Sequence, residues 1–310
     1  RTIGDAFLFK DREKEVFRKM LRKQAAFAGV QVLTYAIMSN HVHLLVRVPY
    51  RSSESIDDAE LLRRYRELYG EHVPGGAYSP EELEKELQNG GAVAERLRAR
   101  LKSRMGDLAM FMQELKQRFT RWYHHLHGGH GTIWAEAYKA LLVQDDPYVL
   151  KVVAAYIDLN PVRAELANEP SEYRFCGYSE ALGGGTQARN GIISVCGYKS
   201  WEDSLSGYQL FLYEKGRTDK GAVDGKDEGR IPEEAVDRVK ASGGKLTVAE
   251  ALRYRIRYFQ DGVALGNESF VESIFSSARE RFGAKRQTGA RVLRAFPKEE
   301  PLRVLRDLQS

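Results

Sequence analysis

Two histidines separated by one residue are the first candidates for chemistry in this sequence. His41 and His43 lie in the run MSNHVHLLV (38–46), whose aliphatic and β-branched residues predict a strand. Because alternate residues of a strand face the same way, both imidazoles would project side by side from one face of a sheet. Neutral imidazole is a common ligand of divalent metals. Taken alone the pair indicates a metal site only weakly, since histidines at this spacing are more often partly exposed polar residues.

A tyrosine and an asparagine form a second candidate pair. Tyr156 and Asn160 are four residues apart in the run YIDLNPVRA (156–164), at the end of a helix that Asp146 and Pro147 are predicted to start. About 40° separates two such positions around a helix axis, so the phenol and the amide would share one face. Considered alone, Tyr156 is better interpreted as a core aromatic residue with its hydroxyl at the rim.

A third group consists of histidines at a glycine-rich helix end, namely His124, His125, His127 and His130. No cysteine or carboxylate accompanies them at a regular ligand spacing, so we interpret them as a surface feature that can touch phosphate rather than as a metal site. The two cysteines, Cys176 and Cys196, make neither a disulfide framework nor a spaced zinc site. This usage favours a reducing, cytoplasmic setting.

Local patterns predict the elements that must position these residues. Residues 13–27 have helical periodicity and stop at Gly29, and residues 30–38 and 41–48 are predicted strands joined by the two-residue hairpin loop Ser39-Asn40. The other expected elements are charged helices within 50–105, a helix over 107–126, a strand over 138–144, a helix from 146 to 160, a helix over 201–213, and helices from 232 to 306.

Several spaced motifs together resemble a known protein family. MSNHVHLLV is followed by FMQELKQRFTRWY (111–123), GTIWAEAYKALLV (131–143), YIDLNPVRA (156–164) and YRFCGYSEAL (173–182). In this order they resemble the REP-associated tyrosine transposases, which belong to the transposase-like HUH single-strand DNA endonucleases with one catalytic tyrosine. The resemblance covers roughly residues 1–182.

The resemblance implies a fold, a site and a reaction. The expected fold is α+β, with a ferredoxin-like antiparallel sheet flanked by helices. Tyr156 matches the nucleophile, and His41, His43 and Asn160 match the metal ligands, for which Mg²⁺ or Mn²⁺ is expected. The reaction would nick single-stranded DNA near hairpin repeats through a 5′-phosphotyrosine intermediate and rejoin strands, as in DNA transposition, with no nucleotide cofactor.

Two other functions fit the same residues. A domesticated regulatory protein would bind hairpin DNA and cleave little, and a plain metal phosphodiesterase would cleave without a covalent intermediate. A covalent protein–DNA adduct would distinguish the nicking and rejoining enzyme from both of these alternatives. Either a monomer or a homodimer is compatible with the sequence.

The charge favours a polyanionic partner. The formal net charge is +5 and the pI about 9.0; residues 231–310 alone hold 15 basic and 11 acidic residues. A solvated helix face explains this charge equally well. The candidate DNA contacts are Lys116, Arg118, Arg121, Lys139, Arg281, Lys285, Arg286, Arg291 and Arg294.

The expected domain organisation has three parts. Residues 1–182 would form the catalytic domain with a charged helical insertion at about 50–105, residues 183–230 a linker region with one helix, and residues 231–310 a basic helical extension. The extension would either read DNA or pack as a cap on the catalytic domain. No run of about 18 apolar residues and no secretory leader is visible, so no membrane association is expected.

Overall fold

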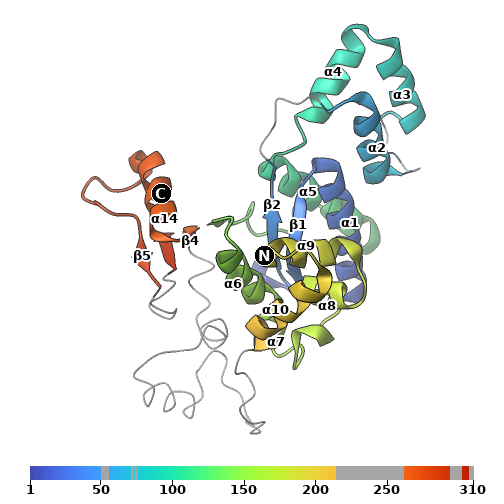
Figure 1. Ribbon diagram of the computed structural model, residues 1–310. Coiled ribbons are helices and arrows are strands. Elements are labelled where there is room, and N and C mark those ends of the chain that lie inside the picture. Colours follow the sequence, from blue (N-terminus) through green and yellow to red (C-terminus); the bar gives the residue numbers. More distant parts are fainter. Residues whose placement is uncertain (50–55, 71–72, 74–75, 214–261, 294–301, 307–310) are drawn as a thin grey trace, which may run out of the picture. The chain divides into compact units, whose positions relative to one another are not determined.

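Figure 1 shows the computed structural model, which describes residues 1–49, 56–70, 73, 76–213, 262–293 and 302–306. The described chain is a mixed α+β structure, mostly helical, with two small sheets. It divides into two compact units, Arg1–Tyr138 and Lys139–Ser310. The expected catalytic domain, 1–182, therefore covers the first unit and the beginning of the second. None of the helices in the described ranges is long and apolar enough to cross a membrane.

The predicted hairpin forms the sheet of the first unit. Strands β1 (Gln31–Ile37) and β2 (Val42–Arg47) pair antiparallel, with Ala36 opposite His43. The amide of Met38 donates to the carbonyl of His41 at 2.8 Å, which closes the predicted two-residue loop. The preceding helix α1 (Asp11–Ala28) ends at Gly29, whose φ of 68° places it in the left-handed region that glycine favours. The prediction of this hairpin and helix is confirmed.

An aromatic cluster holds the two long helices of this unit together. Helix α5 (Leu108–His127) begins after Asp107, whose carboxylate accepts from the Met110 amide at 2.9 Å, and it packs against α1. The Phe119 ring meets Phe9 and Phe17 edge-on, with ring centroids 5.2 and 5.1 Å apart. The short 3₁₀ helix η1 (Ile3–Asp5) precedes this cluster.

The charged insertion folds as three helices with a small core of its own. These are α2 (Asp58–Tyr69), α3 (Pro80–Asn89) and α4 (Gly91–Lys102), and they lie together in Figure 1. Their buried residues form a cluster that also includes Phe27 of α1; its insertion members are Leu61, Leu62, Tyr65, Leu68, Leu83, Leu87 and Leu101. The prediction of helices in 50–105 is therefore confirmed, and the insertion is anchored to α1.

The third predicted strand is much shorter than expected. Only Leu142–Val143 (β3) are extended and paired, and their partner is β4 (Gly262–Gly266) of the same unit, in parallel. Residues 135–140 are exposed, so they present no buried face that would hold them in a sheet. Within the described residues the first unit accordingly has a two-stranded sheet, and no ferredoxin-like sheet is found there.

The second unit is built on helices that follow β3. They are α6 (Pro147–Asp158), α7 (Asn160–Arg163), η2 (Pro170–Glu172), α8 (Gly177–Leu182), α9 (Thr186–Cys196) and α10 (Trp201–Tyr213). The expected linker region, residues 183–230 with one helix, holds two helices in its described part, because α9 precedes α10 there. Ala188, Ile192 and Val195 are buried at helical spacing, and this periodicity outweighs the glycines.

The described part of the C-terminal extension is a sheet with one helix. Strands β4, β5 (Arg291–Val292) and β6 (Arg303–Arg306) join β3 in the order β3-β4-β6-β5, accompanied by α14 (Glu268–Ser277) and η3 (Arg279–Arg281). The prediction of an all-helical extension is therefore wrong here: the apolar runs are too short for helical periodicity, and they bury Ala264, Leu265, Val304 and Leu305 between neighbours. Residues 214–261, where further helices were predicted, lie outside the described residues.

A buried polar contact links the helices of the second unit. The Asp158 carboxylate is fully buried; it accepts from the Tyr208 hydroxyl at 2.6 Å and from the Tyr178 amide at 3.3 Å. Burial, together with the nearby Asp158, raises the pKa of Tyr208 well above its usual value, so the hydroxyl keeps its proton and donates.

Replacing Tyr208 with phenylalanine should destabilise the protein. The substitution leaves a buried carboxylate oxygen without its donor, and such a loss costs about 1–3 kcal/mol. Unfolding in urea measures the change, and Tyr198→Phe, at an exposed tyrosine of the same unit, is the matched control with an expected change near zero. Equal stabilities of the two variants would show that the Asp158 contact contributes nothing.

Candidate functional site

The two histidines lie next to each other at the start of β2. Their ring centroids are 4.9 Å apart and the rings are nearly perpendicular, at 88°. His41 immediately precedes the strand and His43 is inside it, opposite Ala36 of β1. The prediction that the hairpin places both imidazoles side by side is confirmed.

Burial and a contact with Asn40 keep the His41 imidazole neutral and oriented. Burial, with a smaller contribution from the positive charge of Arg1, lowers the pKa of His41 to about 4, so its imidazole is neutral at physiological pH. Its Nδ1 lies 2.6 Å from the Oδ1 of Asn40. An amide oxygen only accepts hydrogen bonds, so the proton sits on Nδ1 and the lone pair of Nε2 is left for a cation. From the sequence, Asn40 is predicted only as a residue of the two-residue loop.

The tyrosine and asparagine lie where α6 passes into α7. Tyr156 is buried, with 2 % of its surface exposed, and Asn160 is nearly so. The Asn160 Nδ2 donates to the carbonyls of Tyr156 and Ile157, at 3.0 and 3.3 Å. These bonds use the amide nitrogen and fix the side chain one turn after Tyr156. The amide oxygen is then the atom that a hard cation would bind.

Arg163, which was not among the residues predicted from the sequence, lies over the ring of Tyr156. The Arg163 guanidinium carbon lies 4.2 Å from the centroid of the Tyr156 ring, and Nη2 donates to the Tyr156 carbonyl at 2.7 Å. Burial lowers the pKa of Arg163 to about 10, which still leaves it charged at neutral pH. The sequence feature that could have identified Arg163 is its position seven residues after Tyr156, which is two helical turns further along.

The structure thus holds two pairs, each within one unit. His41 and His43 belong to Arg1–Tyr138, whereas Tyr156 and Asn160 belong to Lys139–Ser310. In the described parts of the chain, no group of three or more His, Cys, Asp or Glu residues is arranged to hold a metal.

The histidines at the end of α5 contact the protein itself. The His124 ring nitrogens lie 3.1 Å from the Gly128 carbonyl and 2.9 Å from the Gly131 carbonyl. His127 Nε2 lies 3.1 Å from a carboxylate oxygen of Glu13 in α1. His125 and His130 are exposed. These contacts secure the turn after α5.

The candidate DNA contacts on α5, and Lys139 further along the chain, differ in exposure and in the contacts that they make. The Lys116 ammonium donates to the carbonyls of Glu136 and Ala137, and burial lowers its pKa. Arg118 lies over the Tyr69 ring and donates to the Leu68 carbonyl. Arg121 and Lys139 are exposed.

The C-terminal candidates also separate into two kinds. Arg281, Lys285 and Arg291 are exposed. Arg286 instead lies over the rings of Phe275 and Phe282 and donates to the carbonyls of Thr288 and Gly289, so it packs the end of the small sheet domain. Arg294 lies outside the described residues.

No family model, no curated protein and no solved structure matches this chain. The two residue pairs, and the chemistry that their side chains allow, are therefore the basis for assigning a function.

Proposed function

We propose that the protein is a metal-dependent single-stranded DNA endonuclease and strand transferase of the transposase-like HUH type. The observation that carries the proposal is the His41–His43 pair, with adjacent rings and a neutral, oriented His41. The second pair, Tyr156 and Asn160, supplies the nucleophile and the amide ligand that this chemistry needs. In the proposal the β1–β2 hairpin is part of a ferredoxin-like sheet.

The donor set suits a hard divalent cation. Two neutral imidazoles and one amide oxygen, from His41, His43 and Asn160, would hold Mg²⁺ or Mn²⁺ and leave positions for phosphate oxygens. When bound, such a metal polarises the scissile phosphate and offsets the charge of the transition state.

Tyr156 performs the covalent step. Its phenol oxygen attacks the phosphorus, the bond from phosphorus to the 3′ oxygen breaks, and a 5′-phosphotyrosine forms. The phenolic proton is lost to solvent, and the departing 3′ oxygen takes up a proton to become a hydroxyl. A second 3′-hydroxyl can reverse the exchange and join strands without ATP, because the phosphotyrosine retains the bond energy. The cation of Arg163 over the ring favours the negative charge that develops on the phenol.

The burial of Tyr156 favours a second candidate, a regulatory protein that binds hairpin DNA and cleaves little. A hydroxyl on a side chain only 2 % exposed reaches phosphorus only if DNA binding opens the site.

Incubation with hairpin-bearing single-stranded DNA and Mn²⁺, followed by a denaturing gel, separates the candidates. The proposed function predicts a protein band shifted by covalent DNA, the regulatory protein predicts binding without cleavage, and a plain phosphodiesterase predicts cut DNA without a shifted band.

Arg163→Met should slow formation of the adduct without weakening DNA binding. A desolvated cation over an aromatic ring is worth about 2 kcal/mol, so we expect the rate to fall by about 30-fold. Arg163→Lys keeps the charge and should recover part of the rate. Single-turnover kinetics at saturating DNA measure the rate, and an unchanged rate in Arg163→Met would remove Arg163 from the mechanism.

A further inference from the structure

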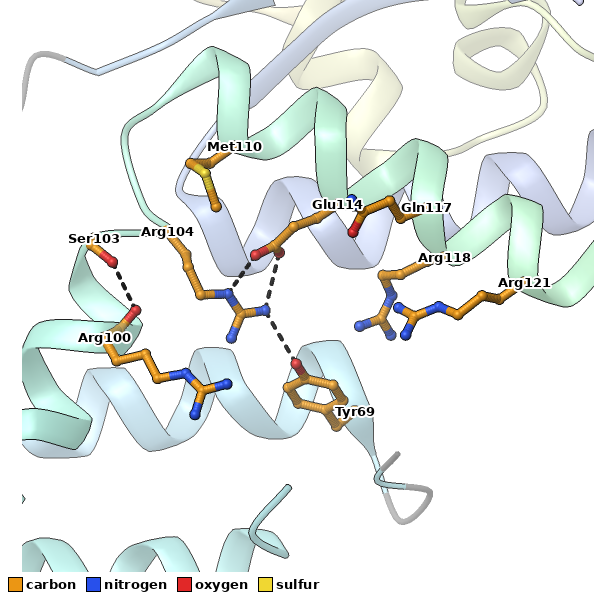
Figure 2. Close-up of a pocket in the computed structure, with 9 residues that line it drawn as sticks. All are labelled: Tyr69, Arg100, Ser103, Arg104, Met110, Glu114, Gln117, Arg118 and Arg121. Carbon is orange, nitrogen blue, oxygen red and sulfur yellow. Dashed lines mark hydrogen bonds and ion pairs between the residues drawn. The ribbon is translucent and has the colours of Figure 1, made fainter. Parts of the chain in front are cut away.

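An arginine-lined pocket lies in the first unit, where the insertion meets α5. Its volume is about 400 Å³, and neither His41 nor His43 lines it. Figure 2 shows that the Arg100 side chain enters from the end of α4, Arg104 from just beyond it, and Arg118 and Arg121 from α5. Glu114 is the one acidic residue in the lining. The pocket thus carries four cationic groups against one carboxylate.

Arg104 and Glu114 form the frame of the pocket and neutralise each other. The Arg104 guanidinium donates to both carboxylate oxygens of Glu114, at 2.6 and 3.0 Å, and to the Tyr69 hydroxyl at 3.1 Å. Figure 2 draws this bridge between the insertion and α5. The carboxylate is therefore used by Arg104, and the other arginines are left in excess.

Arg118 is held in place without an acidic partner among the contacts that the structure gives it. It lies 5.0 Å over the Tyr69 ring and donates to the Leu68 carbonyl at 3.2 Å. Burial lowers the pKa of Arg118; the nearby Tyr69 and Glu114 raise it, and the positive charges of Arg104 and Arg121 lower it by smaller amounts. Since a guanidinium stays charged at neutral pH, these like charges repel, and a bound anion would relieve the repulsion.

Arg100 and Arg121 are exposed, and among the residues that the structure describes neither guanidinium has a hydrogen-bond or ion-pair partner. Several other arginines of the insertion make ion pairs instead: Arg63 and Arg64 with Glu60, Arg66 with Glu84, and Arg98 with Asp58. The pocket therefore gathers exposed cations from two helices around a carboxylate that Arg104 already uses.

We propose that this pocket binds the phosphodiester backbone of a single nucleic-acid strand through Arg100, Arg118 and Arg121. The guanidinium fork matches two phosphate oxygens, and three forks presented by two helices suit phosphates repeated along a strand better than one isolated anion. A pocket of about 400 Å³ has room for a nucleotide-sized group. The inference rests on the proposed function in one respect only, namely that the bound strand is DNA.

Fluorescence anisotropy of the full chain with a labelled oligothymidylate strand, in EDTA so that no cleavage occurs, tests the pocket. The variant is Arg100→Gln/Arg121→Gln. The control, Arg12→Gln/Arg96→Gln, removes the same charge from two exposed arginines on α1 and α4 that do not line the pocket. For two lost phosphate contacts, the salt slope of log affinity should shrink by about 1.4, and affinity should fall about 25-fold at 0.1 M salt. The control should stay within about twofold of the wild type, because it removes no contact.

Three results would overturn the proposal. Equal losses in the variant and the control would mean that only net charge matters. A variant that loses binding of inorganic phosphate in calorimetry but keeps its affinity for the strand would make the pocket a site for a small phosphate ligand. Full loss of affinity in Arg100→Lys/Arg121→Lys as well would point to altered structure rather than lost charge. The pocket and the proposed function are tested separately. If the wild type forms no covalent adduct in the gel assay, a salt slope that falls as predicted would still establish that the pocket binds the strand.

Discussion

Tyr156→Phe is expected to abolish the covalent protein–DNA adduct and to leave DNA binding intact. The substitution removes only the hydroxyl, and the ring still packs beneath the Arg163 guanidinium 4.2 Å away, so folding should change little. Removal of a nucleophile that forms a covalent intermediate typically costs about 10⁴-fold or more in rate, so the shifted band should disappear. A denaturing gel with hairpin-bearing DNA and Mn²⁺ gives the adduct yield, and anisotropy gives the affinity.

Tyr178→Phe is a matched control for this substitution, since Tyr178 is also a buried tyrosine of the second unit. It should keep full adduct formation. An adduct of unchanged yield in Tyr156→Phe would contradict the assignment, and mass spectrometry of the linked peptide would then show which of the tyrosines that remain in the variant reacts.

Loss of either histidine should abolish Mn²⁺-dependent cleavage. With the ring centroids only 4.9 Å apart, His41→Ala or His43→Ala removes one of two neighbouring ligands, and Asn160→Ala should weaken cleavage less severely. Calorimetry should show a parallel fall in Mn²⁺ affinity, larger in the double histidine variant than in either single variant.

His125→Ala serves as the control for the metal experiment, because His125 is exposed on α5. It should bind Mn²⁺ as the wild type does. Wild-type affinity in the double variant of His41 and His43 would place the metal elsewhere, with the histidines at the end of α5 the next residues to test.

Local patterns were sufficient for the elements that carry the site. The hairpin, α1, α5 and the start of α6 each have a cap, a turn or a period that acts within a few residues, and the adjacency of the histidine rings follows from the two-residue repeat of a strand. The four-residue spacing also lets the Asn160 side chain reach the backbone carbonyl of Tyr156, whereas the shared face of the phenol and the amide stays a prediction.

Features that depend on contacts between different segments of the chain could not be predicted from the sequence. The arginine pocket is lined by residues from α2, from the end of α4 and from α5, and no local spacing relates Arg100 to Arg121. Asn40 acts on His41 through a turn geometry that its residue type alone does not specify. The small C-terminal sheet was missed because β3 and β5 have two residues each, too few for any period to appear.

The pairing of β3 with β4 has a consequence for how the chain is made. The Gln144 side chain accepts from the amide of Asn267, 123 residues further along, and α6 begins only a few residues after β3. At 5–20 residues per second, a ribosome needs about 6–25 s to supply that partner after β3 has been synthesised. The first unit, whose sheet and helices all come from earlier residues, can fold during this interval, whereas the strand beside the Tyr156 helix must wait for its neighbour until synthesis is almost complete.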